Sequence, residues 1–583
     1  MTPRIVAHSL TGRDWLEPIP DEAHARALAA RFDLPEVVGR ILALRGVAEN
    51  EAETFLDPRL RTSLPDPSVL RDMDAAAERL AGAVRQGERV GIISDYDVDG
   101  CTSAALVRRW AAALDVETVL RIPHRLYDGY GPSERLVDEL IDAGCGLVLV
   151  LDSGINAHGP LDHAAARGLD VVVVDHHRAE PDLPRAHAVV NPNRRDEDGR
   201  LGGLAAVGVT FLLLVAANRT LRRAGAFAVG REPALLSWLD LVAVGTVADV
   251  VPLTGLNRAF VHQGLKILAQ GGSTGLQALA LEAGVARRPS SESIAFALAP
   301  RLNAAGRVAE ASWAAELLTT DDPARAAALA AELDRLNGER RRLEQEIQAA
   351  AVERLETQLA AERRVLLAAG EDWHPGVLGI VAGRLAERFH RPVFVAGVRD
   401  GRATGSARGP ARYDVAGALE RATAAGLTLK AGGHARAGGF TVAVDRLDAF
   451  HAAIEDGAGA PHPAPLTVDA AVAVSGATRR LLDGLAKLEP YGEQHPPPRL
   501  RVVGVRIAHV RVVGERHLKV QAAGADGGRL DAIAFRAVDT PLEAALARAA
   551  GLPAVQVAGR LRPDDYRGDG AVQLLLEDVA PEA

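Results

Sequence analysis

The sequence predicts an α/β protein with two α/β lobes containing parallel sheets, a long helix that joins them, and a small β-barrel at the C-terminal end. Three observations indicate this. Apolar, mostly β-branched runs alternate with helical segments in two separate regions, which is typical of parallel sheets. A highly charged helical stretch lies between these regions, at residues 321–363. After about residue 498, short strand-like segments follow one another between turns, a pattern that favours a barrel.

Size, charge and cysteine content fit an ordinary multidomain protein. The 583 residues are too many for one hydrophobic core and predict about three or four domains. The net charge of −9 is mild and does not by itself indicate a nucleic-acid binder, although it also does not exclude a local basic groove. The two cysteines, Cys101 and Cys145, fit a reducing compartment. No signal-like start or membrane-length apolar run is evident, so we expect a cytoplasmic protein.

The first lobe is expected over residues 73–320, after short helices and loops in residues 1–72. Its expected strands are residues 89–94, 116–123, 147–152 and 171–175. Helical segments separate these strands, so the strands should run parallel and end at one edge of the sheet.

The long helix and the second lobe follow. Residues 321–363 predict helix almost throughout, with a break near Asn337 and Gly338. We interpret them as a connector between lobes, and a surface helical hairpin is the alternative. A second strand–helix–strand unit occupies residues 364–461 and ends in a glycine-rich segment. A linker then leads into the barrel, so that residues 462–583 form the last region.

Three acids follow the first strand of the first lobe. The segment SDYDVDG places Asp95, Asp97 and Asp99 on alternate residues. Like charges ~4 Å apart repel by roughly 4 kcal/mol per pair at an effective dielectric constant near 20. The three carboxylates therefore either spread into solvent on a turn or surround a cation.

Further candidate metal ligands follow two other strands and an apolar helix. They are Asp152 after LVLVL, Asp175-His176-His177 after VVVV, and Asp249 in GTVADVVPL. Because functional groups gather beyond the carboxyl ends of parallel strands, we expect them at one rim. Carboxylates and imidazoles without thiolates favour Mn²⁺ or Mg²⁺ over Zn²⁺ or Fe²⁺. Each residue taken singly also has a structural explanation, as a turn aspartate, a strand-end cap or a surface histidine.

The order of these segments resembles that of a known superfamily. SDYDVDG, LDSGI, VVVVDHH and GTVADVVPL resemble the signature segments of the DHH phosphoesterases, with residues 175–177 as the eponymous triplet. FLDPRL near Phe55, PRLNAAGR at residues 300–307, GGHARAGGF at residues 432–440 and the barrel narrow the resemblance to the RecJ family of 5′→3′ exonucleases specific for single-stranded DNA. The likeness covers nearly the whole chain.

The resemblance implies five regions. They are an N-terminal segment packed on the catalytic domain (1–72), a DHH catalytic domain (73–320), a connecting helix (321–363), a DHHA1 substrate-binding domain (364–461) and an OB-fold domain (462–583).

The resemblance also implies two divalent cations, Mn²⁺ or Mg²⁺, bridged by Asp152. The other implied ligands are Asp95 and Asp97 at the first ion and Asp99, His176 and Asp249 at the second. The implied catalytic residues are His177, Asp152 and Asp175. His177 would lie near the scissile phosphate. Asp175 would orient a ligand imidazole through a hydrogen bond, or alternatively cap the strand end.

Candidate substrate-binding residues are polar or glycine residues in three segments: Arg301, Asn303 and Arg307; Ser406 and Arg408; and Gly433, His434 and Arg436. Arginines suit phosphate oxygens, with surface ion pairing as the alternative. We expect Ser406 and Arg408 to hold a terminal 5′-phosphate.

The barrel offers further candidates for contact with single-stranded DNA. They are Arg501, Arg506, Arg511, Arg516 and Lys519, with Tyr491, Phe535 and Tyr566 for stacking. The alternative is a structural lid that narrows the entrance to the site.

The implied function is hydrolysis of single-stranded DNA to 5′-mononucleotides in DNA repair and recombination. The implied partners are a single-strand-binding protein and a RecQ-type helicase, and we expect a monomer. Two alternatives are a DHH-family phosphodiesterase for short RNA or cyclic dinucleotides, and a non-catalytic scaffold that only binds single-stranded DNA. PRLNAAGR and the barrel disfavour the first, and the intact set of aspartates and histidines disfavours the second.

Overall fold

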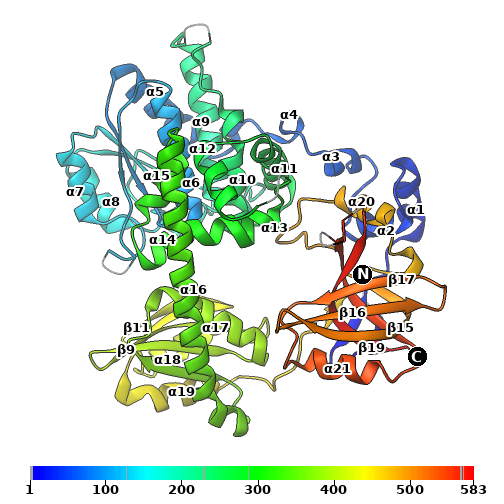
Figure 1. Cartoon of the computed structure of the whole chain (residues 1–583). Helices are drawn as coiled ribbons and strands as arrows, with labels where there is room; N and C mark the ends of the chain where they lie inside the picture. The colour runs from blue at the N-terminus through cyan, green and yellow to red at the C-terminus, as the bar shows by residue number, and fades with distance from the viewer. Residues whose placement is uncertain are drawn as a thin grey trace. The chain divides into compact units, whose positions relative to one another are not determined.

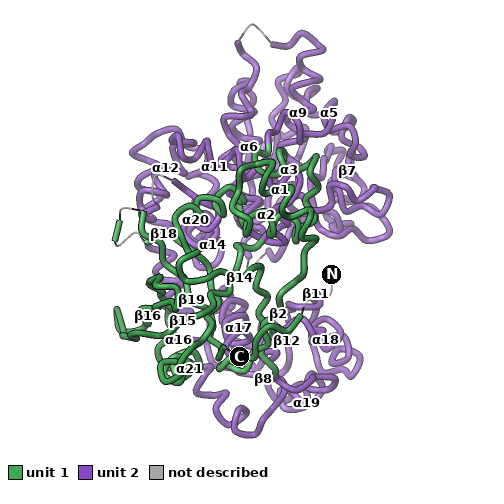
Figure 2. The backbone as a smooth tube through the Cα atoms, turned by 90° about the vertical axis from the view of Figure 1, so that its right-hand side faces the viewer, with its two compact units in different colours: residues 1–58, 462–491, 496–583 green, residues 59–461, 492–495 purple. Residues whose placement is uncertain are grey.

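The protein divides into two compact units. The computed structural model describes residues 4–125, 128–227, 230–285, 288–564, 567–568 and 570–582. Unit 1 combines residues 1–58, 462–491 and 496–583, and unit 2 combines residues 59–461 and 492–495 (Figure 2). Both ends of the sequence therefore contribute to unit 1.

Unit 1 contains a five-stranded closed barrel. Its strands are β15 (Leu500–Val513), β16 (His517–Gly524), β17 (Arg529–Ala534), β18 (Val555–Pro563) and β19 (Val572–Pro581). Strand β15 pairs with both β16 and β18, which closes the order β15-β16-β17-β19-β18 into a ring. The short strand β14 (Ala470–Ala473) adds to β15 in parallel, and α20 (Arg479–Ala486) and α21 (Pro541–Ala549) complete this part. The predicted barrel is confirmed.

The N-terminal residues of unit 1 pack on this barrel. They form β1 (Arg4–His8), β2 (Asp14–Glu17), α1 (Glu22–Arg31), α2 (Glu36–Leu44) and α3 (Ala52–Leu56), and β2 pairs in parallel with β13 (Leu466–Thr467). Leu28 and Ile41 share one hydrophobic core with Val502 of the barrel. This packing differs from the expected packing of residues 1–72 on the catalytic domain. The apolar helix faces are visible in the sequence, but nothing local identifies a partner at the other end of the chain.

The first lobe of unit 2 is built on a parallel sheet with the strand order β4-β3-β5-β6-β7. The strands are β3 (Val90–Ser94), β4 (Thr118–Arg121), β5 (Leu147–Leu151), β6 (Asp170–Val174) and β7 (Ala188–Val190). Alternate residues of β5 face different cores: Leu149 packs in the larger core and Val148 in a smaller one. Helices therefore cover both faces of the sheet, and its buried strands read as continuous apolar runs.

Many helices surround this sheet (Figure 1). Those before residue 235 are α4 (Leu60–Ser63), η1 (Pro67–Val69), α5 (Met73–Gln86), α6 (Val98–Ala112), α7 (Glu134–Asp142), α8 (His158–Ala166) and α9 (Ala206–Arg223). Those after it are η2 (Leu235–Trp238), α10 (Leu239–Ala248), α11 (Gly255–Ala269), α12 (Thr274–Glu282), α13 (Ser291–Ser293), η3 (Ile294–Leu298), α14 (Ala299–Val308) and α15 (Ser312–Thr319). The α7 and α8 helices cover one face, and α5, α6 and α9 cover the other.

A single helix, α16 (Pro323–Ala360), connects the two lobes of unit 2 (Figure 1). It packs on α12 and α14 of the first lobe and on α17 and β8 of the second. The predicted break near Asn337 and Gly338 is wrong, because the helix continues through both residues. A mid-helix glycine costs only about 1 kcal/mol, which the burial of neighbours such as Leu333 and Leu336 offsets.

The second lobe has a mixed sheet of order β11-β12-β10-β9-β8. Its elements are β8 (Leu366–Glu371), α17 (Pro375–Phe389), β9 (Val393–Arg399), β10 (Arg402–Arg408), α18 (Val415–Ala424), β11 (Lys430–His434), β12 (Ala437–Ala443), η4 (Val444–Arg446) and α19 (Leu447–Glu455). Strands β8 and β9 pair in parallel and the other pairs are antiparallel. The predicted class of two α/β lobes, a long helix and a C-terminal barrel is confirmed.

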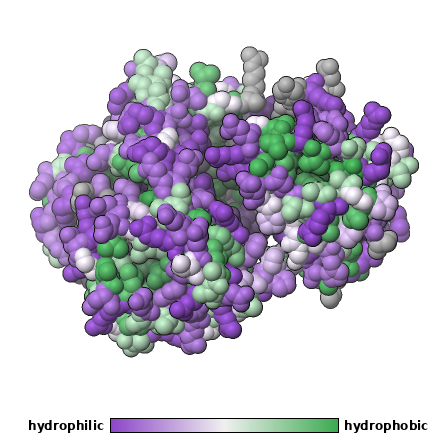
Figure 3. Space-filling view, turned by 60° about the horizontal axis from the view of Figure 1, so that its bottom comes forward, coloured by the Kyte–Doolittle hydropathy of each residue, from purple (hydrophilic) through white to green (hydrophobic). Residues whose placement is uncertain are grey.

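The surface and the helices also bear on a membrane location. The face in Figure 3 is largely hydrophilic, with hydrophobic residues in separate patches. Among the described residues, no helix combines the length and apolar character needed to cross a membrane.

Candidate metal centre

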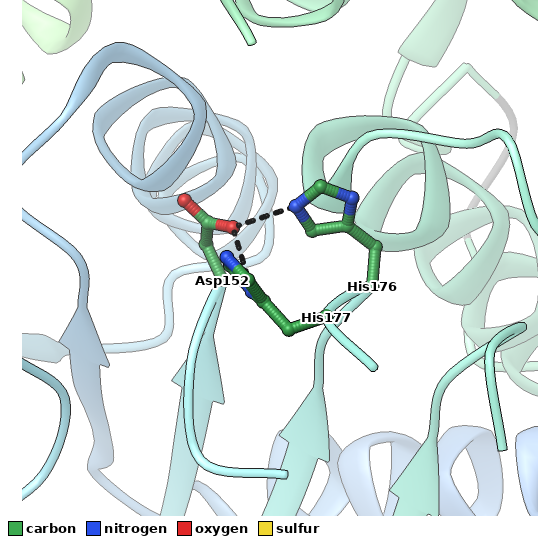
Figure 4. A group of neighbouring side chains, drawn as sticks. All are labelled: Asp152, His176 and His177. Atoms are coloured by element: carbon green, nitrogen blue, oxygen red, sulfur yellow. Dashed lines mark ion pairs between the residues drawn. The ribbon is translucent and has the colours of Figure 1, made fainter. Parts of the chain in front are cut away.

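The predicted ligands lie together at the carboxyl edge of the first sheet. Asp95 directly follows β3, Asp152 follows β5, and His176 and His177 follow β6, so parallel pairing of these strands brings them to one rim. Figure 4 shows the Asp152 carboxylate between the His176 and His177 rings. Asp249 reaches the same place from the end of α10. The expected gathering of chain-distant acids and imidazoles is therefore present.

His176 is at the centre of one group of ligands. Its Nε2 atom lies 3.4 Å from Asp152 Oδ1, 3.5 Å from Asp249 Oδ2 and 3.9 Å from Asp99 Oδ2. Asp152 also belongs to a second group with Asp95 and Asp97, in which one ligand atom from each residue lies within 4.8 Å of the others. Asp152 is thus the carboxylate common to both sides of the cluster.

The acidic loop turns directly from β3 into α6. Asp97 caps this helix by accepting a hydrogen bond of 3.0 Å from the backbone N–H of Gly100, and Asp99 lies in its first turn. The three acids therefore do not alternate along one extended strand. A Cβ atom on Gly100 would lie 2.4 Å from the backbone oxygen of Asp95, so this tight turn requires glycine.

Asp99 also forms hydrogen bonds with a second helix. Its two carboxylate oxygens accept hydrogen bonds from the backbone N–H groups of Ala206 (2.7 Å) and Val207 (2.8 Å), at the N-terminus of α9. The partial positive charge of a helix N-terminus favours such an anion. Burial and the charge of Asp97 nevertheless raise the pKa of Asp99 to about 7. Asp99 thereby joins the loop after β3 to the helix that covers the sheet.

Burial makes the negative charge of this cluster costly. It raises the pKa of Asp95 to about 8 and that of Asp249 to about 9, with neighbouring aspartates adding to both shifts. The pKa of Asp152 is also raised well above its usual range, first by burial and then by Asp99. Burial and the charge of His177 lower the pKa of His176 to about 4, which leaves a neutral imidazole, the form that binds metals.

Several atoms in the cluster also lack hydrogen-bond partners. Asp95 Oδ1, Asp152 Oδ1, Asp249 Oδ2 and His176 Nε2 are buried without one. Buried polar atoms are otherwise almost always paired, so this set needs a ligand. Oxygen-rich donors with one imidazole fit Mg²⁺ or Mn²⁺. The residues present therefore fit a divalent metal centre.

Asp175 holds the histidine loop. It accepts hydrogen bonds from the backbone N–H groups of Ile155, His176 and His177, and from His177 Nδ1 at 2.8 Å. Burial opposes its charge, but the hydrogen bonds from His177 outweigh burial and lower its pKa. These bonds fit the predicted capping role, and Asp175 also orients an imidazole, although not that of the predicted metal ligand. The imidazole it orients is that of His177, and not that of His176.

Three residues that the sequence did not single out complete this edge. The Tyr130 hydroxyl donates to the backbone oxygen of Asp152 at 3.0 Å and lies 3.1 Å from His177 Nδ1. Asn191 and Asn193, after β7, donate to the backbone oxygens of His177 and His176. Tyrosine and asparagine in loops form no diagnostic pattern. Only the position of Asn191 after the next parallel strand was a usable signal.

The arginines predicted to bind substrate fall into two classes. Arg301 is nearly buried, pairs with Asp334 of α16 at 2.8 Å and donates to Ala297, so it fastens α14 to α16. That pairing corrects the expectation of a phosphate contact by Arg301. Arg307 instead lines a cavity of about 180 Å³ with Asn303.

Ser406 and Arg408 lie on β10 against α17. A Cβ atom added to Gly379 of α17 would come 3.0 Å from the Arg408 guanidinium and 3.5 Å from Ser406 Oγ, so this glycine lets the helix approach both. Burial and then the charge of Arg125 lower the pKa of Arg408. Arg125, from the loop after β4, is a further residue that the sequence did not single out, and its guanidinium lies 5.2 Å from the Tyr96 ring centre.

The glycine-rich segment forms the β11–β12 hairpin. A Cβ atom on Gly433 would lie 2.4 Å from the backbone oxygen of Ala437, so the close pairing of these strands requires glycine. His434 and Arg436 at its tip are exposed.

The barrel residues predicted to contact single-stranded DNA also fall into two groups, paired and exposed. Arg501 pairs with Glu17 and Lys519 with Asp531, whereas Arg506, Arg511 and Arg516 are exposed. Phe535 is 51% exposed, with the Arg562 guanidinium 5.7 Å from its ring centre. The Tyr491 hydroxyl donates to the Leu485 backbone, and Tyr566 lies outside the described residues.

Three protein-family models match the chain. The DHH family, N-terminal domain, matches residues 89–246, the DHHA1 domain matches residues 362–459, and the RecJ OB domain matches residues 468–578.

Individual relatives match along almost the whole chain. The single-stranded-DNA-specific exonuclease RecJ of Dickeya dadantii is 39% identical over 568 residues, covering 94% of this chain and 96% of the relative. The crystal structure of Thermus thermophilus RecJ in complex with Mn²⁺ is 33% identical with a TM-score of 0.81 and covers 98% of this chain and 80% of that chain. The Mg²⁺ complex of the same protein is 32% identical with a TM-score of 0.74, and covers 98% and 79%. The chain belongs to the RecJ family of single-stranded-DNA-specific exonucleases.

Proposed function

We propose that this protein is a metal-dependent 5′→3′ exonuclease that hydrolyses single-stranded DNA to 5′-mononucleotides. The observation that carries the proposal is the set of buried, unpartnered ligand atoms on Asp95, Asp152, His176 and Asp249 at one sheet edge. The name of the relatives supports the substrate. A non-catalytic scaffold would not need to keep such a costly group of acids.

Two divalent cations, Mn²⁺ or Mg²⁺, fit these residues. Asp95, Asp97 and Asp152 would hold one, and Asp99, Asp152, His176 and Asp249 the other. The chemistry that such ions supply when bound is activation of a water and neutralisation of charge on the phosphodiester. The Mn²⁺ and Mg²⁺ complexes of the Thermus relative support the choice of metal.

His177 would contact the scissile phosphate. Its Nδ1 atom is engaged by Asp175, which fixes the ring and leaves Nε2 for the substrate. Burial alone would lower the pKa of His177, but the hydrogen bond and charge of Asp175 raise it, so the ring carries a proton near neutral pH more readily than an ordinary histidine does. The proton on Nε2 would then stabilise negative charge on the phosphate or on the leaving oxygen.

Ser406 and Arg408 would hold the terminal 5′-phosphate, together with Arg307. The charge of Arg125 lowers the pKa of both Arg307 and Arg408 after burial, which supports a cluster of guanidinium groups suited to an anion. A strand end held there would present the next phosphodiester to the metal centre, which accounts for removal of nucleotides one at a time. Gly433, His434 and Arg436 would contribute further backbone and side-chain donors.

The Arg408→Ala variant tests this 5′ pocket. Its kcat/KM should fall by about 10- to 100-fold on 5′-phosphorylated single strands, because a charge-assisted hydrogen bond to phosphate is lost. The loss on 5′-hydroxyl strands should be much smaller. Equal losses on both substrates would reject the pocket. The exposed Arg61→Ala variant is the matched control.

The remaining features of the proposal follow from the family. We propose a role in DNA repair and recombination, cooperation with a single-strand-binding protein and a RecQ-type helicase, a monomeric state and a cytoplasmic location. We also propose the domain limits 73–320, 321–363, 364–461 and 462–583. The exposed Phe535, with Arg506, Arg511 and Arg516, supports contact of the barrel with single-stranded DNA.

One experiment tests the central proposal. The protein is incubated with Mn²⁺ and with 5′- or 3′-labelled single-stranded and duplex DNA, alongside Asp152→Asn and His176→Ala. We expect release of 5′-mononucleotides from single strands, lowered more than about 100-fold in both variants. The exposed Asp162→Asn variant is the matched control and should remain active. Activity that survives both ligand substitutions, or that requires RNA or a cyclic dinucleotide, would refute the proposal.

A further inference from the structure

A cavity of about 630 Å³ lies at the edge of the first sheet opposite the metal centre. Its walls come from the C-terminal end of α6, the loop into β4, Trp238 of η2 and the connection between α15 and α16. Thr118, the first residue of β4, lines it, whereas the metal ligands follow the carboxyl ends of the strands. Helix α6 begins beside the metal centre and has 15 residues, so the cavity is about 20 Å away. It is therefore separate from the metal centre.

Arg108 places a positive charge in this cavity without a direct counter-ion. Among the described residues, its one hydrogen bond is a long one, 3.4 Å from Nη1 to Thr319 Oγ1. Burial lowers the pKa of Arg108, and the charge of nearby Glu316 acts against this. The Glu316 carboxylate, however, accepts hydrogen bonds of 2.6 and 2.8 Å from Arg325, which neutralises its charge. The Arg108 guanidinium therefore keeps several donors for an anion.

Arg109, the next residue, has a different role and fixes the cavity wall. It donates to the backbone oxygen of Leu318 at 2.9 Å and to the Asp321 carboxylate at 2.9 Å, so it joins α6 to the connection that leads into α16. Thr320 Oγ1 accepts a hydrogen bond of 3.2 Å from the backbone N–H of Asp322, the residue that caps α16. The wall is thus held in place by the protein itself, and a preformed wall lowers the entropy cost of binding a ligand.

Trp238 gives the cavity an aromatic wall. It is half-buried against the core of the lobe, and within the described part of the chain its indole Nε1 forms no hydrogen bond. The indole of Trp110, by contrast, donates to Asn218 at 2.7 Å, as buried tryptophans usually do. The Thr118 hydroxyl adds a further polar group, and the apolar part of the wall is completed by Ala112, Ala113 and Val116. A planar ring, a free N–H group and a guanidinium thus face one space.

We propose that this cavity binds a nucleoside 5′-monophosphate, the product that the proposed function releases beside the protein at each turnover. The base would stack on Trp238, and the phosphate would pair with Arg108. The volume lies in the range of small-molecule sites. Inorganic phosphate would leave the aromatic wall unused, and an uncharged nucleoside would leave Arg108 without an anion. The identity of the ligand rests on the proposed function.

Titration calorimetry of the full chain in a chelator tests the cavity without turnover. The ligands are 2′-deoxyadenosine 5′-monophosphate, deoxyadenosine and inorganic phosphate, and the nucleotide should bind at least about 10-fold more tightly than either fragment. Arg108→Ala should raise its Kd by about 10- to 100-fold, because a charge-assisted hydrogen bond to phosphate is lost. Trp238→Leu should raise the Kd by about 5- to 150-fold, the range of base–aromatic stacking, and Trp238→Phe should lose less because it keeps a ring.

Controls separate the possible failures. Arg85→Ala removes an exposed arginine from the last turn of α5 and should keep the full affinity, and circular dichroism confirms that each variant is folded. Arg408→Ala should also keep it, since the nucleotide is not expected in the 5′ pocket under these conditions. The inference is overturned if the nucleotide does not bind at millimolar concentration, if a fragment binds as tightly, or if Arg408→Ala abolishes binding and Arg108→Ala does not. Binding as expected by a protein that degrades no single-stranded DNA with Mn²⁺ would instead refute the proposed function alone.

Discussion

At the scale of single residues, Asp95, Asp152 and Asp249 of the metal centre differ from ordinary surface aspartates because each has a buried carboxylate oxygen without a hydrogen-bond partner. Asp138, by contrast, is paired with His163 and Arg167, and these partners lower its pKa. Residue types and their order along the chain predicted the cluster around Asp152 and His176. They did not predict Tyr130 or Arg125, because a tyrosine and an arginine in a loop are chemically unremarkable until the fold places them beside the site. They also did not reveal that Arg301 has a partner, Asp334.

Tyr130 gives a prediction at this scale. Its hydroxyl joins the Asp152 backbone to His177, so Tyr130→Phe should loosen the His177 ring without removing a metal ligand. We expect kcat to fall by about 10- to 100-fold with little change in KM, the range found when a supporting hydrogen bond to a metal site is lost. Steady-state kinetics over a range of pH measures both parameters.

Tyr413→Phe is the matched control for that measurement. Its hydroxyl donates to the backbone oxygen of Ile454 in the core of the second lobe, at 2.6 Å. This variant should lose about 0.5–1.5 kcal/mol of stability and keep its kcat. An unchanged kcat in Tyr130→Phe would show that the hydroxyl does not position His177.

At the scale of elements, periodicity and β-branched runs predicted the buried strands closely. Strands β5 and β6 lie where the apolar runs predicted them, and the barrel strand β16 matches the segment HLKVQAAG. Glycine residues were less reliable indicators of where a helix or a strand ends. Gly338 by its residue type favours a helix break, but the long α16 keeps its geometry because residues on either side of it pack into a core. The glycines of β11 and β12 proved to be strand residues that allow close pairing.

Gly338 offers a second prediction. It is exposed within α16, and a Cβ atom added to it meets nothing within 4 Å. Gly338→Ala should therefore stabilise unit 2 by about 0.5–1 kcal/mol, since alanine loses less backbone entropy in a helix. The melting temperature followed by circular dichroism should rise by roughly 2 °C. A lower melting temperature would indicate that α16 is not helical there. Exonuclease activity should not change.

At the scale of the whole molecule, local patterns identified each region but not how the regions combine. The division into unit 1 and unit 2 depends on contacts such as that between Ile41 and the barrel core, which join opposite ends of the sequence. No periodicity encodes such pairing. The same limit applies to the metal centre: strand order, and not spacing along the chain, brings Asp152 beside Asp95 and His176.

The stability of the metal-free protein should depend on pH because of this acid cluster. The pKa values of Asp95 (about 8), Asp99 (about 7) and Asp249 (about 9) in the folded state exceed the ordinary value of 3.8. The folded state therefore binds more protons than the unfolded state, and folding becomes less favourable as pH rises through these values. Above pH 7, His176 is neutral in both states and contributes little to the change.

Thermal unfolding in a chelator tests this dependence. The melting temperature should fall between pH 7 and pH 9 without metal, and Mn²⁺ should restore it more strongly at pH 9. Asp249→Asn should reduce the fall of the melting temperature with pH, because it removes one of the carboxyl groups whose pKa is raised. A melting temperature that rises with pH in the chelator would contradict the assigned burial of these acids.

Unit 1 combines segments from both ends of the sequence, and this has a consequence for biosynthesis. Residues 1–58 leave the ribosome before residues 462–583, which form the barrel that covers the apolar sides of α1 and α2. About 400 residues are translated in between, which takes some 20–80 s at ordinary elongation rates. During that interval the leucine and isoleucine side chains of α1 and α2 are not yet covered by the barrel. They then form an exposed apolar surface of the kind that chaperones bind.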